Sequence, residues 1–224
     1  PLKTASKEGF YRYMLFLQYF YKKTYNTLRE YKNLDYAVSA GNFSIFQLVI
    51  SLNLTLNINA SLEVAIQKEY DDIFYYIVDN FYNHFNMKNF LNVWLEASKR
   101  KTAKYFNYLN NKLSLNDLLI KYGFKLPDFL NILNGCIFQA NVELVHKLTE
   151  FILVNYSNPN FTVQFNNALN CHSEEICQYF IDKKVTVSIS KIISNSNLIN
   201  TAGGKIALYL INEIMKFIPF ICFV

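Results

Sequence analysis

LDYAVSAGNFSIFQLVI, residues 34–50, is the stretch that decides the fold of this chain. An apolar residue opens it at Leu34, and small or apolar residues follow three and four positions later. Next comes the pair Gly41 and Asn42, and apolar residues recur eleven, twelve, fifteen and sixteen positions after the start. Spacings of three and four predict a helix with one buried stripe, and a Gly-Asn pair predicts a break. The stretch therefore predicts a brief first helix, a turn and a longer second helix.

The same spacing recurs along the chain. Further copies start near positions 2, 62, 94, 133 and 165, and a last one near 195. The steps between successive starts are similar, and only the step from 94 to 133 is clearly longer than the others. A near-constant period of about 30 residues indicates a supersecondary unit stacked on copies of itself. Because neither helix of a unit can bury its stripe alone, stacking must supply the core.

These units resemble ankyrin repeats. PLKTASKEG (1–9) is similar to the ankyrin opening, and ALNCHSEEICQYFIDKKVTV (168–187) resembles a unit from its first helix to its hairpin. The resemblance implies an all-α fold, an ankyrin-like solenoid of about six to seven stacked helix-turn-helix repeats in one domain over residues 1–224. The usual Gly after the second helix is absent from SLNLTLN (51–57) and DKKVTV (182–187). Such erosion resembles the ankyrin arrays of viruses, intracellular bacteria and parasitic protists.

The longer step between the starts at 94 and 133 leaves the register open. It contains LLIKYGFKL (118–126), which resembles the end of an ankyrin second helix. Between residues 110 and 132 we therefore expect either an extra helix or a shifted register.

Composition points to a folded intracellular chain. Of its 224 residues, 52% are hydrophobic and 17% are charged, a balance typical of folded proteins. Only six Gly and four Pro argue against a barrel or sandwich, which would need many tight turns. The cysteines show no CxxC pair and no metal-ligand spacing, so we expect reduced thiols and a cytoplasmic location. For a protein of a virus or intracellular pathogen, this means the host cytosol or nucleus. The four are Cys136, Cys171, Cys177 and Cys222.

No catalytic motif stands out. His172 falls at an inter-helix turn, where the ankyrin resemblance implies a backbone hydrogen-bonding role. The acidic pairs in EYDD (69–72) and SEE (173–175) fall at the starts of second helices, where the helix dipole favours negative charge. The Gly-Gly-Lys at 203–205 lacks the rest of a phosphate-binding loop. We therefore predict no enzyme activity, no cofactor, no metal and no small-molecule substrate.

The C-terminal run at 206–224 is very apolar but contains Glu213 and Lys216. A membrane-spanning helix needs about 20 apolar residues with few or no charges. We therefore expect a terminal solenoid helix followed by an apolar tail, and no membrane partner.

Binding is the function that these features favour. In ankyrin-like arrays the binding face is built from first-helix positions that point away from the stack and from the loops between repeats. KRKTAK (99–104) is the one concentrated basic stretch, and it is either a binding patch or a solvated turn. We predict a protein-protein interaction module or scaffold, as in host-pathogen interaction. The alternative is a component of a ribonucleoprotein or nucleic-acid-associated complex that uses this patch to bind RNA. The candidate partner-binding residues are Tyr36, Gln67, Lys68, Lys99, Arg100, Lys101, Lys104, Phe138, Gln139 and Asn170.

Overall fold

A computed structural model describes residues 38–39, 41–51, 58–81, 87–187, 208–209 and 211–212. They fall into two compact units. Unit 1 contains the described residues of 38–97 and 105–114, and unit 2 contains those of 98–104 and 115–212. Within these residues the regular secondary structure consists of α-helices, which confirms the all-α class.

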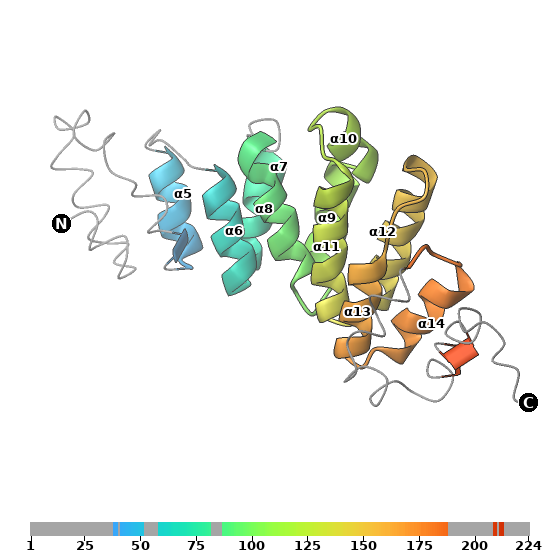
Figure 1. Ribbon diagram of the computed structural model, residues 1–224. Helices are drawn as coiled ribbons and strands as arrows, with labels where there is room; N and C mark the ends of the chain where they lie inside the picture. The colour runs from blue at the N-terminus through green and yellow to red at the C-terminus, as the bar shows by residue number, and fades with distance from the viewer. Residues whose placement is uncertain are drawn as a thin grey trace, which may run out of the picture. The chain divides into compact units, whose positions relative to one another are not determined.

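Unit 1 is built of helices joined in hairpins (Figure 1). Helix α6 packs against α7 within one hairpin, and α5 lies against α7. In the next hairpin the rings of Trp94 and Phe106 meet edge to face, with centroids 4.9 Å apart. The helices are α5 (Phe43–Ser51), α6 (Ile58–Lys68), α7 (Asp71–Phe81), α8 (Met87–Ser98) and α9 (Lys104–Lys112).

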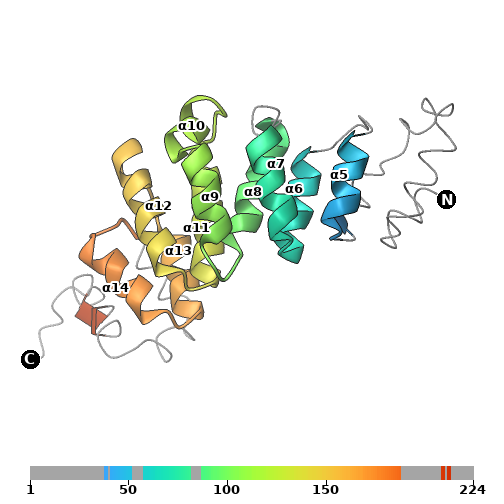
Figure 2. The ribbon, with the colours of Figure 1, turned by 180° about the vertical axis from the view of Figure 1, so that it is seen from behind.

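Unit 2 contains two hairpins that lie side by side (Figures 1 and 2). The first helices of the hairpins, α11 and α13, pack against each other, and so do the second helices, α12 and α14. After α14, Thr186 forms an isolated parallel bridge with Asn160, which precedes α13. The helices are α10 (Leu115–Ile120), α11 (Leu126–Phe138), α12 (Val142–Asn155), α13 (Thr162–Asn170) and α14 (Glu174–Asp182).

The helices of the structure differ from the prediction in their number and in their lengths. Helix α10 is an extra helix between the copies starting at 94 and 133, but it includes only residues 118–120 of the segment LLIKYGFKL (118–126). The expectation of a brief first helix and a longer second one fails for most of the described hairpins. Helices α6 and α7 have 11 residues each, α13 and α14 have nine each, and α8 has 12 against nine in α9; α12, with 14, exceeds α11, with 13. For α8 the reason is an additional N-terminal stretch, in which Phe90 is fully buried before the predicted start at 94.

The same turn joins the two helices of three hairpins. Glu69, Ala140 and His172 have positive φ angles of 58°, 50° and 54°. In each turn, the N–H of this residue donates to the carbonyl three residues back, and the next N–H donates to the carbonyl five residues back. This is the Schellman pattern that ends a helix with one left-handed residue. The predicted turn at His172 is thus confirmed, and it is the backbone of His172 that makes it.

Glycine is required at the corresponding turn before α5. Gly41 has a φ of 67°, and a Cβ atom there would lie 2.5 Å from the ring of Tyr70. The Tyr70 hydroxyl donates to the carbonyl of Ser39, at 3.4 Å. The Gly-Asn pair of the deciding stretch therefore provides both the turn and the space for a neighbouring ring.

Replacing Ala140 by glycine is expected to raise the free energy of unfolding by about 0.5–1 kcal/mol, because an L-residue with a side chain is strained at positive φ. Ala140 is exposed, so no packing is lost. Urea titration followed by circular dichroism measures the change. In the exposed helical control Lys147→Gly, stability should fall by a similar amount. A loss of stability in Ala140→Gly would contradict the role given to this turn.

The core repeats from one pair of copies to the next. When the copies starting at 62 and 94 are aligned with those starting at 133 and 165, matching positions are buried in both pairs. The predicted apolar positions of these four copies are therefore confirmed as buried, except Ile181, which is half-buried. The buried pairs are Leu62 and Leu133, Ala65 and Cys136, Ile66 and Ile137, Ile73 and Leu144, Phe74 and Val145, Ile77 and Leu148, Phe90 and Phe161, Trp94 and Phe165, Ala97 and Ala168, Tyr105 and Ile176, Phe106 and Cys177, and Leu109 and Phe180.

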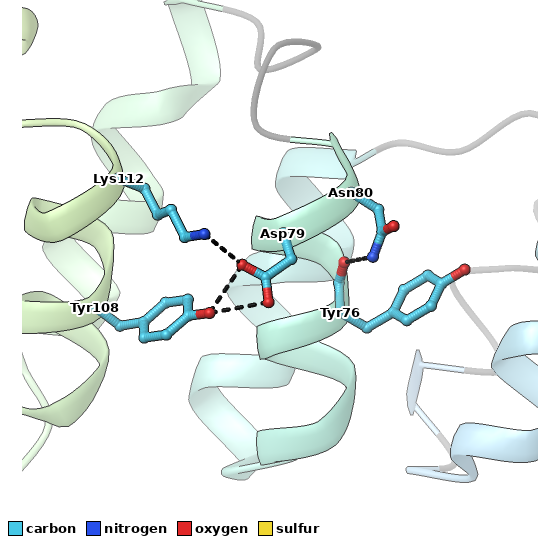
Figure 3. Close-up of polar contacts among 5 residues, drawn as sticks. All are labelled: Tyr76, Asp79, Asn80, Tyr108 and Lys112. Atoms are coloured by element: carbon cyan, nitrogen blue, oxygen red, sulfur yellow. Dashed lines mark hydrogen bonds and ion pairs between the residues drawn. The ribbon is translucent and has the colours of Figure 1, made fainter.

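A polar cluster on α7 and α9 joins neighbouring hairpins of unit 1 (Figure 3). Asp79 accepts hydrogen bonds from the Tyr108 hydroxyl at 2.8 and 2.9 Å, and its Oδ1 lies 2.8 Å from Nζ of Lys112. The ring of Tyr75 meets that of Tyr108 edge to face, with centroids 4.6 Å apart. The hydrogen bond from Lys112 holds the pKa of Asp79 below its usual value.

A related cluster lies at the matching positions of α12 and α14, where the Tyr179 hydroxyl donates to the carbonyl of His146 at 3.3 Å. Glu150 pairs with Lys183 at 2.8 Å, and the ring of His146 stacks on that of Tyr179 at 3.7 Å. In both clusters the lysine Nζ lies 5.7 Å above the ring of the tyrosine four positions before it. Adjacent second helices are therefore held in the same register in both units.

Several predictions fall outside the described residues. They concern the copies starting near 2 and 195, Cys222, the Gly-Gly-Lys at 203–205, and most of the run at 206–224. Among the helices that the structure describes, none is long and apolar enough to cross a membrane.

Candidate interaction surface

Five of the ten candidate residues lie at the ends of first helices, and four of these five are exposed. They lie just before the left-handed residue of each turn. In unit 1 these are Gln67 and Lys68, both exposed. In unit 2, Phe138 leaves 56% of its surface in solvent, Gln139 is half-buried, and Asn170 is exposed. An aromatic side chain as open as that of Phe138 at a helix end is available to a partner.

The basic loop, residues 98–104, belongs to unit 2. Lys99 and Lys101 are exposed, whereas Arg100 and Lys104 are half-buried. A Cβ atom added to Gly135 of α11 would overlap the Ser98 side chain. The loop therefore starts beside α11, about one helical turn before Phe138.

Helix electrostatics bears on the choice between a patch and a solvated turn. Helix α8 ends at Ser98, so Lys99 lies at a C-terminus, where the dipole favours a cation. Lys104, however, is the first residue of α9, and a cation is unfavourable at a helix N-terminus. Dipole stabilisation therefore cannot account for all of the basic residues.

The structure brings most of the predicted site residues into one unit. The basic loop, Phe138, Gln139 and Asn170 all belong to unit 2, on the loop beside α11 and at the ends of α11 and α13. Gln67 and Lys68 belong to unit 1, and Tyr36 lies outside the described residues.

Sequence reasoning missed a set of amides between α11 and α13. Oδ1 of Asn134 accepts from Nε2 of Gln164 at 3.3 Å and from Nδ2 of Asn167 at 2.9 Å. Nε2 of Gln164 also donates to the carbonyl of Leu130 at 3.3 Å. The signal in the sequence was Asn131, Asn134 and Phe138, whose spacing places them on one face of a helix.

The two predicted acidic pairs lie at helix N-termini. Asp71 and Asp72 lie in the first turn of α7, as predicted for EYDD, and Glu174 and Glu175 lie in that of α14, as predicted for SEE. The Tyr105 hydroxyl donates to Asp71 at 2.5 Å, and burial together with this bond raises the pKa of Tyr105.

The three described cysteines are free thiols, as expected. Burial raises the pKa of Cys136 and of Cys177 to about 12, and it also raises that of Cys171. A thiol becomes a strong nucleophile when its pKa is lowered, which is the opposite of the shift at these three positions.

A cleft of about 550 Å³ opens in unit 2 between the end of α12 and the turn after α14. Residues 153–159 and 184–186 line it, including Tyr156 and Lys184. The Tyr156 hydroxyl is buried and has no hydrogen-bond partner among the residues that the structure describes. The described lining residues supply hydroxyl, amide and ammonium groups for polar contacts.

No protein-family model matches this chain, and neither does any curated protein or solved structure. A function must therefore be argued from the geometry of the described residues. Within them, no group of three or more His, Cys, Asp or Glu side chains could hold a metal ion.

Proposed function

We propose that this chain is an ankyrin-like solenoid that binds a partner protein through the ends and outer faces of its first helices, without catalytic activity. The recurrence of solvent-accessible side chains at the same place in three hairpins, α6–α7, α11–α12 and α13–α14, supports this most directly. Gln67 and Lys68, Phe138 and Gln139, and Asn170 all precede a left-handed turn residue. A surface built on packed helices loses little conformational entropy when it binds.

The chemistry of unit 2 suggests the character of the partner. Phe138 supplies an aromatic side chain of the kind that dominates binding energy at interfaces. Lys99 and Lys101 supply exposed positive charge on the adjacent loop. Electrostatic complementarity would speed association with an acidic surface. We place this binding in the cytosol, because the described cysteines are free thiols.

Charge reversal in the basic loop is the test of this function. With the full chain as bait, Lys99→Glu/Lys101→Glu is expected to lower capture of specific partners by roughly ten-fold, measured by quantitative mass spectrometry. Both side chains are exposed, so folding should be preserved. The control Lys147→Glu/Lys184→Glu changes the net charge equally at exposed positions outside the loop. Equal capture by all three proteins would remove the basic loop from the proposal.

The alternative function is RNA binding as part of a ribonucleoprotein, and four basic residues within six positions favour it. RNA affinity should then fall steeply with salt, because phosphate contacts release counterions. Lys99→Glu/Lys101→Glu should reduce the slope of log affinity against log salt by about 2. Partner binding that does not change between low and physiological salt would reject this alternative.

A further inference from the structure

We propose that the outer faces of α11 and α13 bind an extended, uncharged segment of the partner protein. This inference rests on the proposed function and names the partner's chemistry. The surface, here called the amide stripe, consists of exposed or half-buried residues on two helices that lie side by side. They are Asn131, Asn134 and Phe138 of α11, and Val163, Asn167 and Asn170 of α13.

Hydrogen bonds within the stripe fix the orientation of its two central amides. Because Oδ1 of Asn134 accepts from both Gln164 and Asn167, its Nδ2 donor is turned away from them. Because Asn167 donates through its Nδ2 in this contact, its Oδ1 remains available as an acceptor. Neither of these two remaining atoms has a partner among the described residues. A donor beside an acceptor complements the C=O and N–H of a peptide backbone.

Apolar side chains flank this central pair. Phe138 is 56% exposed and Val163 is 58% exposed. Val163 is one helical turn before Asn167, and Phe138 is one turn after Asn134. The helix rises by about 10 Å from Asn131 to Phe138, a length that about three residues of extended chain would span. The stripe thus fits a short segment with an apolar side chain on either side of one peptide group.

The stripe carries no charge, although the fold permits charge there. At the matching positions, the copies starting at 62 and 94 have Glu63 in place of Asn134, Glu96 in place of Asn167, and Lys99 in place of Asn170. A charged partner side chain would lose hydration on the amide stripe without gaining an opposite charge. The stripe therefore favours a neutral segment, whereas the basic loop favours an acidic one.

Peptide selection tests this inference directly. The full chain is immobilised and used to select from a phage-displayed library of random dodecapeptides. The expected result is a consensus without charged residues and with two apolar positions a few residues apart. A synthetic peptide of that consensus is then titrated by fluorescence polarisation.

Two variants and a matched control locate the binding site. Asn134→Asp keeps the oxygen that accepts from Gln164 and Asn167, so the fold is retained, but it replaces the outward donor by a charged acceptor. Phe138→Ala removes the exposed ring. Each should weaken peptide binding by roughly ten-fold. Asn116→Asp makes the same chemical change at an exposed position of α10, and its affinity should equal that of the wild type.

The outcomes separate this inference from the proposed function. No enriched peptide, an acidic consensus, or a neutral peptide that both variants bind as tightly as the wild type would each overturn it. If Lys99→Glu/Lys101→Glu still lost partner proteins in those cases, the proposed function would stand with the basic loop as its site. Without that loss, the proposed function would fail as well.

Discussion

Phe129→Ala is expected to lower the free energy of unfolding of unit 2 by about 4 kcal/mol, a large part of the stability of a typical domain. Phe129 is fully buried in α11. Its ring centroid lies 5.0 Å from that of Phe151, 5.9 Å from that of Phe124 and 6.3 Å from that of Tyr156. Truncation would remove the transfer free energy of the ring and leave a cavity among rigid neighbours.

The same helix offers the matched control. Phe138→Ala removes an identical side chain that is 56% exposed, so stability should change by less than about 0.5 kcal/mol. Urea unfolding followed by circular dichroism measures both variants. If Phe138→Ala were as destabilising as Phe129→Ala, Phe138 would belong to the core and could not serve as a partner's contact.

The second large effect is a loss of stability at alkaline pH. In the folded chain burial raises the pKa of the Cys136 thiol from 9.0 to about 12. Below pH 9 the Cys136 thiol is protonated in both the folded and the unfolded chain, so its burial contributes fully to stability. Between pH 9 and 12 the unfolded state loses the proton that the folded state keeps, so stability falls by about 1.4 kcal/mol per pH unit, or about 4 kcal/mol in all.

Urea midpoints measured from pH 7 to pH 11 test this expectation. In Cys136→Ala the unfolding free energy should fall less steeply above pH 9, by the contribution of one proton to the slope. Burial of Cys177 continues to contribute to the decline. Cys171 is half-buried, so Cys171→Ala should leave most of the decline unchanged. The same slope in the wild type and in Cys136→Ala would show that this thiol ionises freely in the folded chain.

The period of the sequence was enough to predict the core. Residues spaced three and four apart after the starts at 62, 94, 133 and 165 are buried, because a helix can bury only one side against its neighbours. The break at His172 was predicted from a polar residue between the two helices, at a position where the ankyrin resemblance implies a backbone hydrogen-bonding role. The helix ends were less predictable. Buried residues such as Phe90 and Phe129 precede the predicted starts, and the pattern did not require them.

The candidate surface was only partly predictable. Counting positions from each start identified Phe138 and Asn170 as residues facing away from the core, and both are exposed. Counting could not show that Arg100 and Lys104 are half-buried, because their exposure depends on how the loop folds back. It also could not find the bond between Asn134 and Asn167, which lie 33 residues apart in the chain.

The helical class and the buried side of each described helix could be predicted from the amino-acid sequence, because they follow from local spacing and the cost of exposing apolar surface. Only the tertiary structure decided which polar side chains meet between hairpins. Asp79 pairs with Lys112, and Asn134 with Asn167, because packing brings one helix beside the next in a particular register. Such contacts join residues about one repeat apart, and the angle and register that create them are properties of the packed helices.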